Sequence, residues 1–208
     1  MKILLTGASG LLGRAILKEL TSKNHKHSVT GTAFSRTNSE YTKIDLTKRK
    51  ETSRFVSALS PDLIIHSAAE RRPDIVKNNP SAAEEINIAA TETIAKAAES
   101  CGSCMLFIST DYVFNGKNPP YATDARPNPI NTYGKMKLEG EKIVRNLCSK
   151  NIILRIPIVY GETEFLGESA LTVIAQSLKP DKEVRFDNKQ IRYPAHSADI
   201  AQSIAGIT

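Results

Sequence analysis

The chain opens on an apolar run that breaks into three glycines spaced three apart, Gly7, Gly10 and Gly13, and then becomes a helical pattern. This order predicts a strand, a tight turn and a helix N-terminus. Gly7 can take a positive φ, Gly10 lets backbone approach a phosphate, and Gly13 lets the helix pack on the strand. The unpaired N–H groups and positive dipole end of that helix suit a pyrophosphate. An ordinary glycine-rich turn between a strand and a helix can have the same glycine spacing. The position directly after a strand nevertheless favours nucleotide binding.

Composition excludes several classes of protein. The 208 residues are enough for one domain or slightly more. The net charge is +6, but the basic residues are scattered and aromatic residues make up only 6%, so we expect no nucleic-acid partner. No apolar run approaches membrane-spanning length, and the first residues resemble a core strand rather than a signal peptide. These features predict a soluble, cytoplasmic protein without a membrane partner.

The cysteines and histidines do not predict a metal site. Three cysteines are typical of a reducing compartment. Cys101 and Cys104 have the CxxC spacing, but a zinc site needs a second pair and only Cys148 remains. A redox pair normally stands at a helix N-terminus, whereas this one precedes an apolar run. His25 and His27 have no matching ligand cluster, so no metal is expected.

Strand-like and helix-like patterns alternate along the chain. Strands are expected at residues 2–5, 28–34, 41–44, 63–66, 105–109 and 152–156, and helices at 11–22, 47–59, 80–100 and 130–149. Thr47 is expected to cap the second of these helices, and Gly102 to end the third. The alternation predicts an α/β fold, a doubly wound parallel (Rossmann) sheet with helices on both faces and binding at the carboxyl ends of the strands.

We expect a division of the chain near residue 160. Residues 1–160 are predicted to form an NADP-binding Rossmann domain, and residues 161–208 a small, partial C-terminal substrate lobe. In the second part we expect a helix near 169–178, a short strand around 183–186 and a helix from 197. The loops at 113–129 and 161–168 leave the carboxyl ends of strands and are expected to wall the cleft.

Tyr133 and Lys137 are spaced one helical turn apart on one face. A lysine ammonium near a phenol lowers the phenol pKa, and such a tyrosine can exchange a proton with a carbonyl or alcohol. By itself this pair could be an ordinary surface tyrosine near lysines. Thr110 ends the fifth strand, so its hydroxyl is expected in the same cleft. Together with the glycine loop, these three residues predict a catalytic group.

These motifs resemble the extended short-chain dehydrogenase/reductase superfamily. Residues 6–13 resemble its cofactor loop, and Thr110, Tyr133 and Lys137 resemble its catalytic triad. Residues 109–116, followed by Tyr133-Gly-Lys, resemble the dTDP-4-dehydrorhamnose reductase branch. Within that branch, four segments resemble the regulatory β subunits of methionine adenosyltransferases, at residues 68–74, 118–121, 154–161 and 191–196.

The cofactor is expected to be NADP rather than NAD. An NAD site usually has an acidic residue about 20 positions beyond the glycines, but residues 29–36 contain no acid. Ser35 and Arg36 suit a 2′-phosphate, although Arg36 could be an ordinary exposed loop residue. With what the resemblance implies, the expected cofactor-binding residues are Gly7, Ser9, Gly10, Leu11, Leu12, Gly13, Ser35, Arg36, Asp45, Leu46, Ser67, Ala68, Ala69, Tyr133, Lys137 and Pro157.

Adjacent arginines follow the fourth strand. Arg71 and Arg72 could clamp a substrate phosphate. They could equally pair with Glu70 and Asp74 and shape a partner-binding loop, which the resemblance favours. His66 ends a buried strand and is expected to be a satisfied core histidine, and His196 is expected to have a structural role.

Two functions remain open. The resemblance implies a regulatory subunit that binds NADP(H), associates with a methionine adenosyltransferase catalytic subunit and modulates S-adenosylmethionine synthesis. The alternative is an NADPH-dependent reductase of a keto-sugar nucleotide, since the catalytic residues are intact. The resemblance also implies members that continue well beyond Thr208, so we expect either a naturally short variant or a fragment, with a more open cleft.

Overall fold

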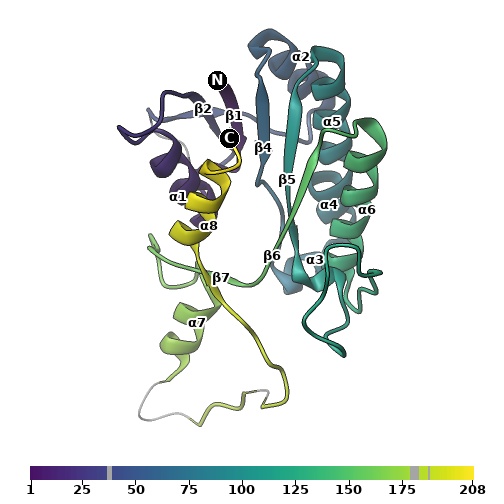
Figure 1. Ribbon diagram of the computed structural model, residues 1–208. Helices are drawn as coiled ribbons and strands as arrows, with labels where there is room; N and C mark the ends of the chain where they lie inside the picture. The colour runs from purple at the N-terminus through teal and green to yellow at the C-terminus, as the bar shows by residue number, and fades with distance from the viewer. Residues whose placement is uncertain (37–38, 179–182, 187) are drawn as a thin grey trace.

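A parallel sheet forms the centre of the protein. The computed structural model describes residues 1–36, 39–178, 183–186 and 188–208. Six strands pair in parallel in the order β3-β2-β1-β4-β5-β6, as Figure 1 shows. Their bounds are β1 Lys2–Thr6, β2 Ser28–Ala33, β3 Tyr41–Lys43, β4 Leu63–His66, β5 Cys104–Thr110 and β6 Ile152–Ile156. The predicted doubly wound α/β fold is therefore confirmed.

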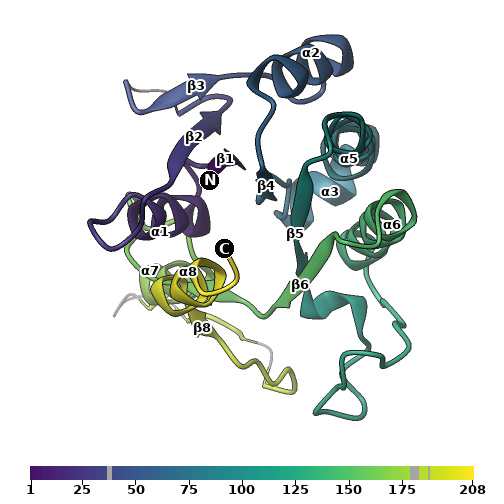
Figure 2. The same ribbon diagram turned by 45° about the horizontal axis from the view of Figure 1, so that its top comes forward.

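Helices cover both faces of this sheet (Figures 1 and 2). One face packs against α1 and α8, and the other against α2, α5 and α6. The bounds are α1 Leu11–Leu20, α2 Arg49–Leu59, α5 Ala90–Cys101, α6 Thr132–Leu147 and α8 Ser197–Ala205.

Alternating side chains of the central strands divide between two cores. In β1, Ile3 and Leu5 belong to the core under α1 and α8, whereas Leu4 belongs to the core under α2, α5 and α6. In β4, Ile65 and Ile64 divide in the same way. Because helices cover both faces, residues 3–5 of β1 and 63–65 of β4 are all apolar and do not alternate with polar residues.

The helix ends test the predicted stop and start signals. Gly102 ends α5 with a φ of 71°, and Ser60 ends α2 with a φ of 44° directly before Pro61. The prediction that Thr47 caps α2 is wrong, because Lys48 occupies the N-cap position. The Thr47 hydroxyl donates instead to Asp45 Oδ1 at 2.7 Å.

The predicted helix at 80–100 is not one continuous α-helix. It comprises α4 Pro80–Glu84, a π-helical turn η1 Glu85–Ala89 and α5, and an unpredicted α3 Pro73–Asn78 precedes it. Asn87, which is 1% exposed, lies in the π-helical turn. Its side chain accepts from Glu70 N and donates to Glu70 O, both at 2.9 Å. The wider turn thus satisfies the backbone of the loop after β4.

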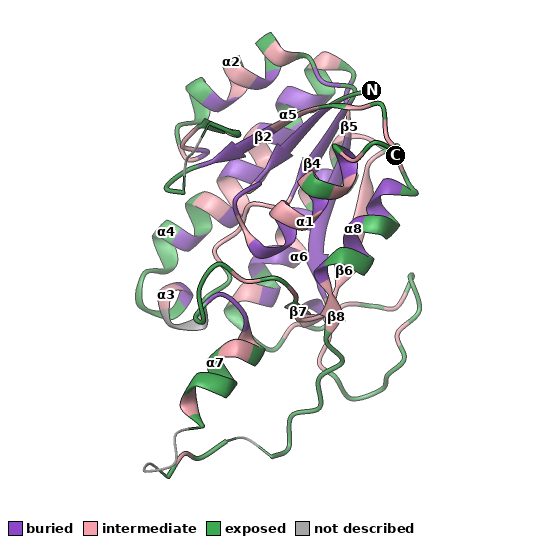
Figure 3. Ribbon diagram, turned by 90° about the vertical axis from the view of Figure 1, so that its left-hand side faces the viewer, coloured by how far each residue is buried: buried purple, intermediate pink, exposed green. Residues whose placement is uncertain are grey.

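The chain beyond residue 156 contributes to both a projecting part and the core. Val159–Tyr160 (β7) pairs in parallel with Ala195–His196 (β8), a pairing that was not predicted. The strand expected at 183–186 is absent. Ala170–Ser177 (α7) has no buried residue and projects at the carboxyl end of the sheet (Figure 3). In contrast, Ile200 and Ile204 of α8 join the core under α1. Within the described ranges, no helix is both long and apolar enough to cross a membrane.

Candidate functional site

The glycine turn brings the loop after β4 against the start of α1. Gly7 has a φ of +69°, and a Cβ atom there would lie 2.8 Å from the Ala68 backbone. The Ala68 N–H donates to Thr6 Oγ1 at 3.3 Å. A Cβ atom on Gly13 would lie 2.1 Å from Gly7 O, so only glycine fits without a backbone shift. The turn and the loop at 67–69 are therefore adjacent, as a shared cofactor site requires.

The N-terminus of α1 is suited to an anion. Gly10 is its N-cap, so no side chain caps the helix, and its first turn holds no acidic residue. A Cβ atom on Gly10 would meet nothing within 4 Å except Gly7 O, at 3.3 Å. The free N–H groups and the helix dipole therefore fit the pyrophosphate of a dinucleotide.

Arg36 lies where the sequence predicts recognition of a 2′-phosphate. It follows β2, and its side chain is 40% exposed. Its Nη1 donates to Glu164 Oε2 at 2.9 Å and to Glu168 Oε1 at 2.6 Å. Ser35 beside it is exposed. The roles of both residues remain predictions.

The remaining expected cofactor residues lie on several elements. Asp45, which follows β3, accepts from the Thr47 N–H at 3.0 Å, while Leu46 is buried. Pro157 directly follows β6. Ser9 provides a carbonyl that accepts from Arg14 Nη1 at 2.9 Å. Their contacts with a cofactor remain predictions.

Tyr133 and Lys137 lie in the first turns of α6, which Asn131 caps by accepting from the Gly134 N–H at 2.7 Å. The Tyr133 ring meets the Tyr112 ring edge-on, with centroids 6.1 Å apart. Lys137 Nζ lies 3.8 Å from the centroid of the Phe107 ring. Thr110 ends β5, and its hydroxyl accepts from the Tyr112 N–H at 3.2 Å. Thr110 and Tyr133 thus lie near the carboxyl end of β5, where Tyr112 contacts both, whereas Lys137 lies over Phe107 in the middle of that strand.

The protonation of this pair differs from the expectation. Burial raises the pKa of Tyr133 to about 12, whereas Lys137 was expected to lower it. Burial also lowers the pKa of Lys137 to about 7, because the ammonium is removed from water. The phenol therefore keeps its proton at neutral pH. It is in the form that can donate a proton, while Lys137 is poised between its two forms.

Lys137 makes stability depend on pH. Its ordinary pKa is 10.5 and its folded value is about 7, so the unfolded state binds more protons between these values. Stability is expected to rise with pH across this window by up to about 1.4 kcal/mol per pH unit. In Lys137→Met this rise should disappear, whereas it should persist in Lys135→Met, which alters an exposed lysine of the same helix. Urea unfolding at pH 7, 8 and 9 measures the slopes, and equal slopes in the two variants would contradict the assignment.

A buried ion pair supports the helix that carries Tyr133 and Lys137. Glu141 is 1% exposed. Its Oε1 accepts from Arg155 Nε at 2.9 Å and from Ser109 Oγ at 2.5 Å, and its Oε2 accepts from Arg155 Nη2 at 2.7 Å. With Ser109, this pair joins α6 to β5 and β6, and no sequence motif predicts it.

The two arginines after β4 have different partners. Arg72 pairs with Glu70, with Nε 2.9 Å from Oε1, and hydrogen bonds and charge from Arg72 outweigh burial to lower the Glu70 pKa. Arg71 donates instead to the carbonyl oxygen of Glu168. The Asp74 side chain, an expected partner of these arginines, lies outside the described residues. Of the expected ion pairs in this loop, the pair between Arg72 and Glu70 is therefore observed.

His66 and His196 have the structural roles that were predicted for them. His66 is completely buried, with Nδ1 2.7 Å from Thr6 Oγ1 and Nε2 3.1 Å from Thr91 Oγ1. Burial lowers the pKa of His66 to about 3. His196 caps α8 by accepting from the Ala198 N–H at 3.2 Å. Across the described part of the chain, no group of three metal-ligating side chains occurs, and all three cysteines are free.

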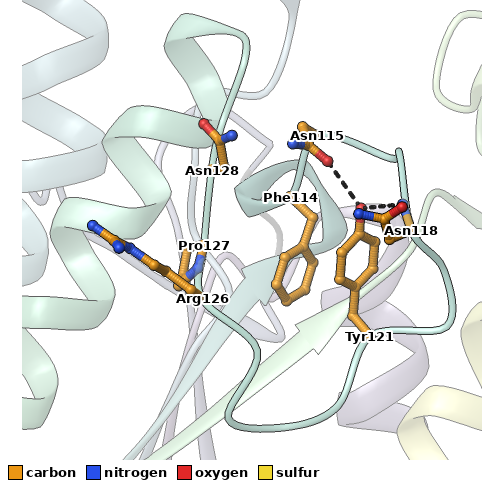
Figure 4. A pocket seen from close by; sticks show the side chains of 7 residues that line it. All are labelled: Phe114, Asn115, Asn118, Tyr121, Arg126, Pro127 and Asn128. Atoms are coloured by element: carbon orange, nitrogen blue, oxygen red, sulfur yellow. Dashed lines mark hydrogen bonds between the residues drawn. The ribbon is translucent and has the colours of Figure 1, made fainter.

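The loop that leaves β5 folds on itself around a cavity of about 470 Å³ (Figure 4). Phe114 and Tyr121 stack with centroids 4.1 Å apart, and Tyr121 Oη donates to Asn115 Oδ1 at 3.1 Å. Asn128 closes the loop through its N–H, which donates to Val113 O at 2.8 Å. These contacts give the loop a defined shape just beyond the carboxyl end of β5.

No sequence motif predicts three further residues of the candidate cofactor site. Arg14 donates from Nη1 and Nη2 to the two carboxylate oxygens of Glu168, at 2.8 and 2.7 Å. Glu164 lies 3.3 Å from Arg14 Nη1. No local pattern links these residues, because Arg14 and Glu168 are 154 positions apart.

The fold and the site together define a class of protein. A parallel sheet of this order, with a glycine turn at the start of its first helix, is the Rossmann architecture of the dehydrogenases. The chain belongs to the RmlD substrate binding domain family, whose model matches residues 1–208.

The similar proteins have names of two kinds, a subunit of methionine adenosyltransferase and dTDP-4-dehydrorhamnose reductases. The chain is 43% identical over 201 residues to methionine adenosyltransferase 2 subunit beta of Bos taurus, covering 96% of this chain and 60% of that protein. It thus spans about three-fifths of the length of this relative. A dTDP-4-dehydrorhamnose reductase structure from Clostridium acetobutylicum is 31% identical, with a TM-score of 0.86, covering 100% of this chain and 70% of that one. The Bacillus anthracis reductase in complex with NADP is 27% identical, with a TM-score of 0.84, covering 99% and 70%.

Proposed function

We propose that this chain is an NADP(H)-binding regulatory subunit, which associates with a methionine adenosyltransferase catalytic subunit in the cytoplasm and modulates S-adenosylmethionine synthesis. The observation that carries the proposal is the 43% identity over 96% of the chain to a protein named as a methionine adenosyltransferase beta subunit. Residues 1–160 provide most of the cofactor site in this proposal, and Glu164 and Glu168 border it at Arg36. In the same proposal, the loop that carries Arg72 faces the partner. The Arg72 side chain is 66% exposed.

The residues present fit a dinucleotide phosphate. The uncapped N-terminus of α1 provides N–H donors for the pyrophosphate, and Arg36 provides a guanidinium for the 2′-phosphate. The relative from Bacillus anthracis, which was solved with NADP, supports the choice of cofactor. NAD remains the alternative.

Arg36→Ala is expected to weaken NADPH binding about tenfold or more, because a charge-assisted hydrogen bond to phosphate is lost. NADH binding should be almost unchanged, since NADH has no 2′-phosphate. Titration of cofactor fluorescence measures both affinities. Arg145→Ala, which removes an exposed arginine near the end of α6, is the matched control. An unchanged ratio of NADPH to NADH affinity in Arg36→Ala would contradict this role.

A reductase of a keto-sugar nucleotide is the second candidate, and the intact Thr110, Tyr133 and Lys137 favour it. A bound nicotinamide supplies the hydride. Tyr133, protonated because its pKa is about 12, would donate a proton to the carbonyl oxygen. Lys137 would hold the tyrosine and the cofactor ribose, and Thr110 would orient the carbonyl. The 31% identity to a dTDP-4-dehydrorhamnose reductase structure supports this candidate.

One experiment separates the two functions. The chain is co-purified with a methionine adenosyltransferase catalytic subunit, with and without NADP, and NADPH oxidation by a dTDP-keto-sugar is assayed in parallel. A stable complex without turnover supports the regulatory function. Rapid NADPH oxidation that Tyr133→Phe abolishes and Tyr112→Phe retains would overturn it in favour of the reductase.

A further inference from the structure

The segment at 161–169 lies against the candidate cofactor site. Glu164 and Glu168 of this segment contact Arg14 of α1 and Arg36 after β2. The Phe165 ring centroid lies 5.7 Å from the guanidinium carbon of Arg36. The arginine predicted to recognise a 2′-phosphate is therefore already paired with carboxylates from a distant part of the chain.

The two glutamates are held very differently. Glu168 is 3% exposed, and its carboxylate accepts two hydrogen bonds from Arg14, one from Arg36 and one from the Glu164 N–H. Burial raises the Glu168 pKa, but the arginine hydrogen bonds outweigh this effect and lower it to about 2. The Glu164 side chain is 50% exposed, and within the described residues its ion pairs are with Nη1 of Arg36, at 2.9 Å, and Nη1 of Arg14, at 3.3 Å.

Arg71 fixes Glu168 from a third direction. It reaches from the loop after β4 and donates to the Glu168 carbonyl oxygen. Arg14 also donates from Nη2 to Glu162 O at 3.0 Å. The position of Glu168 is thus tied to α1, to the end of β2 and to the loop after β4, whereas the Glu164 carboxylate could leave without disturbing these bonds.

The charge and burial of the two carboxylates indicate which of them a phosphate would displace. The side chains of Glu164 and Glu168 balance the charges of Arg14 and Arg36, so these carboxylates weaken the attraction of the two arginines for a dianion. Withdrawing a half-exposed carboxylate into water costs little, whereas removing a buried one leaves uncompensated charge. Release of Glu164 leaves one unbalanced positive charge on Arg14 and Arg36, which both stay paired with Glu168.

We propose that Glu164 is a displaceable counter-ion that occupies the 2′-phosphate position on Arg36, and that Glu168 is a positioning residue that keeps Arg14 and Arg36 in place when the phosphate replaces Glu164. The inference rests on the proposed binding of NADP(H). Glu164 then weakens binding only of ligands that carry a 2′-phosphate, and Glu168 sets the preference for NADPH over NADH.

The test compares three single glutamine variants of the full chain by titration with NADPH and with NADH at constant ionic strength. Glu164→Gln should bind NADPH about two- to fivefold more tightly, with NADH binding unchanged, because a half-exposed ion pair is removed. Glu168→Gln should bind NADPH about tenfold or more weakly and should lose the preference over NADH. The matched control is Glu162→Gln. Glu162 is on the same segment, but its side chain is 91% exposed and its carboxylate makes a long ion pair with Lys18 Nζ, at 3.7 Å. It should match the parent.

The outcomes separate this inference from the function on which it rests. A parent chain that binds neither dinucleotide overturns the proposed cofactor site and this inference with it. A parent that prefers NADPH, with Glu164→Gln no tighter than Glu162→Gln, overturns the role of Glu164 alone. If Glu168→Gln does not fold in a thermal scan, the comparison of Glu164→Gln with Glu162→Gln decides. A folded Glu168→Gln that keeps the preference for NADPH overturns its positioning role.

Discussion

Gly13→Ala is expected to lower the free energy of unfolding by about 3 kcal/mol or more and to abolish dinucleotide binding. A Cβ atom at this position would lie 2.1 Å from the carbonyl oxygen of Gly7 and 2.8 Å from the Ala8 Cα. Both neighbours are backbone atoms and cannot rotate away, so the turn itself must move. Such a shift displaces the N–H groups of the first turn of α1. Urea unfolding measures the loss of stability, and NADPH titration measures the loss of binding.

Gly206→Ala is the matched control, because it makes the same chemical change at another glycine. Gly206 lies just after α8 with a φ of −71°, and its nearest Cβ contact would be Ser203 O at 3.5 Å. Alanine should therefore change stability by less than about 1 kcal/mol there and leave binding intact. Similar losses at Gly13 and Gly206 would show that the close contact is not the cause.

Glu141→Gln is expected to lower the free energy of unfolding by about 3 kcal/mol or more. The Glu141 carboxylate accepts two hydrogen bonds from Arg155 and one from Ser109, and it is almost completely buried. Glutamine is neutral and cannot balance the positive charge of Arg155. The Arg155 side chain is only 17% exposed, so water does not replace the lost carboxylate. Glu141 also raises the pKa of Lys137 by its charge, so the pKa of Lys137 should fall further in the variant. Chemical unfolding and titration of Lys137 by NMR measure these effects.

Glu139→Gln changes a carboxylate of the same helix that lies at the surface. The Glu139 side chain is 46% exposed and pairs with Lys142 at 2.9 Å. An exposed pair of this kind contributes about 0.5 kcal/mol or less, so the variant should unfold almost like the parent. If Glu139→Gln were as destabilising as Glu141→Gln, burial would not be the reason for the larger effect.

Much of the fold follows from local patterns in the sequence. Apolar runs such as residues 63–66 predict strands buried on both faces, and the observed β4 has these bounds. Gly102 and Pro61 mark helix ends correctly, because the left-handed backbone and the residue before proline are local constraints. The π-helical turn at Asn87 was not predictable, since its partner Glu70 lies 17 positions away.

The sequence predicted those residues of the candidate site that form a regular pattern within one turn or one helix. The three glycines and the Tyr133–Lys137 pair are regular patterns within one turn or helix. The pKa of Tyr133 moves in the opposite direction to the expectation, because burial outweighs any nearby positive charge. Burial depends on what packs over the phenol, and no spacing in the sequence reports it.

The sequence by itself determined the Rossmann sheet and the glycine turn, because each depends on interactions between near neighbours in the chain. The catalytic roles of Thr110, Tyr133 and Lys137 remain predictions. Only the tertiary structure decided which charges face the predicted 2′-phosphate site. Arg14 and Arg36 meet Glu168 across 154 and 132 positions. The physical reason is that the carboxyl ends of parallel strands gather at one edge of the sheet. Loops that are distant in sequence therefore exchange charges there, in pairings that no local pattern encodes.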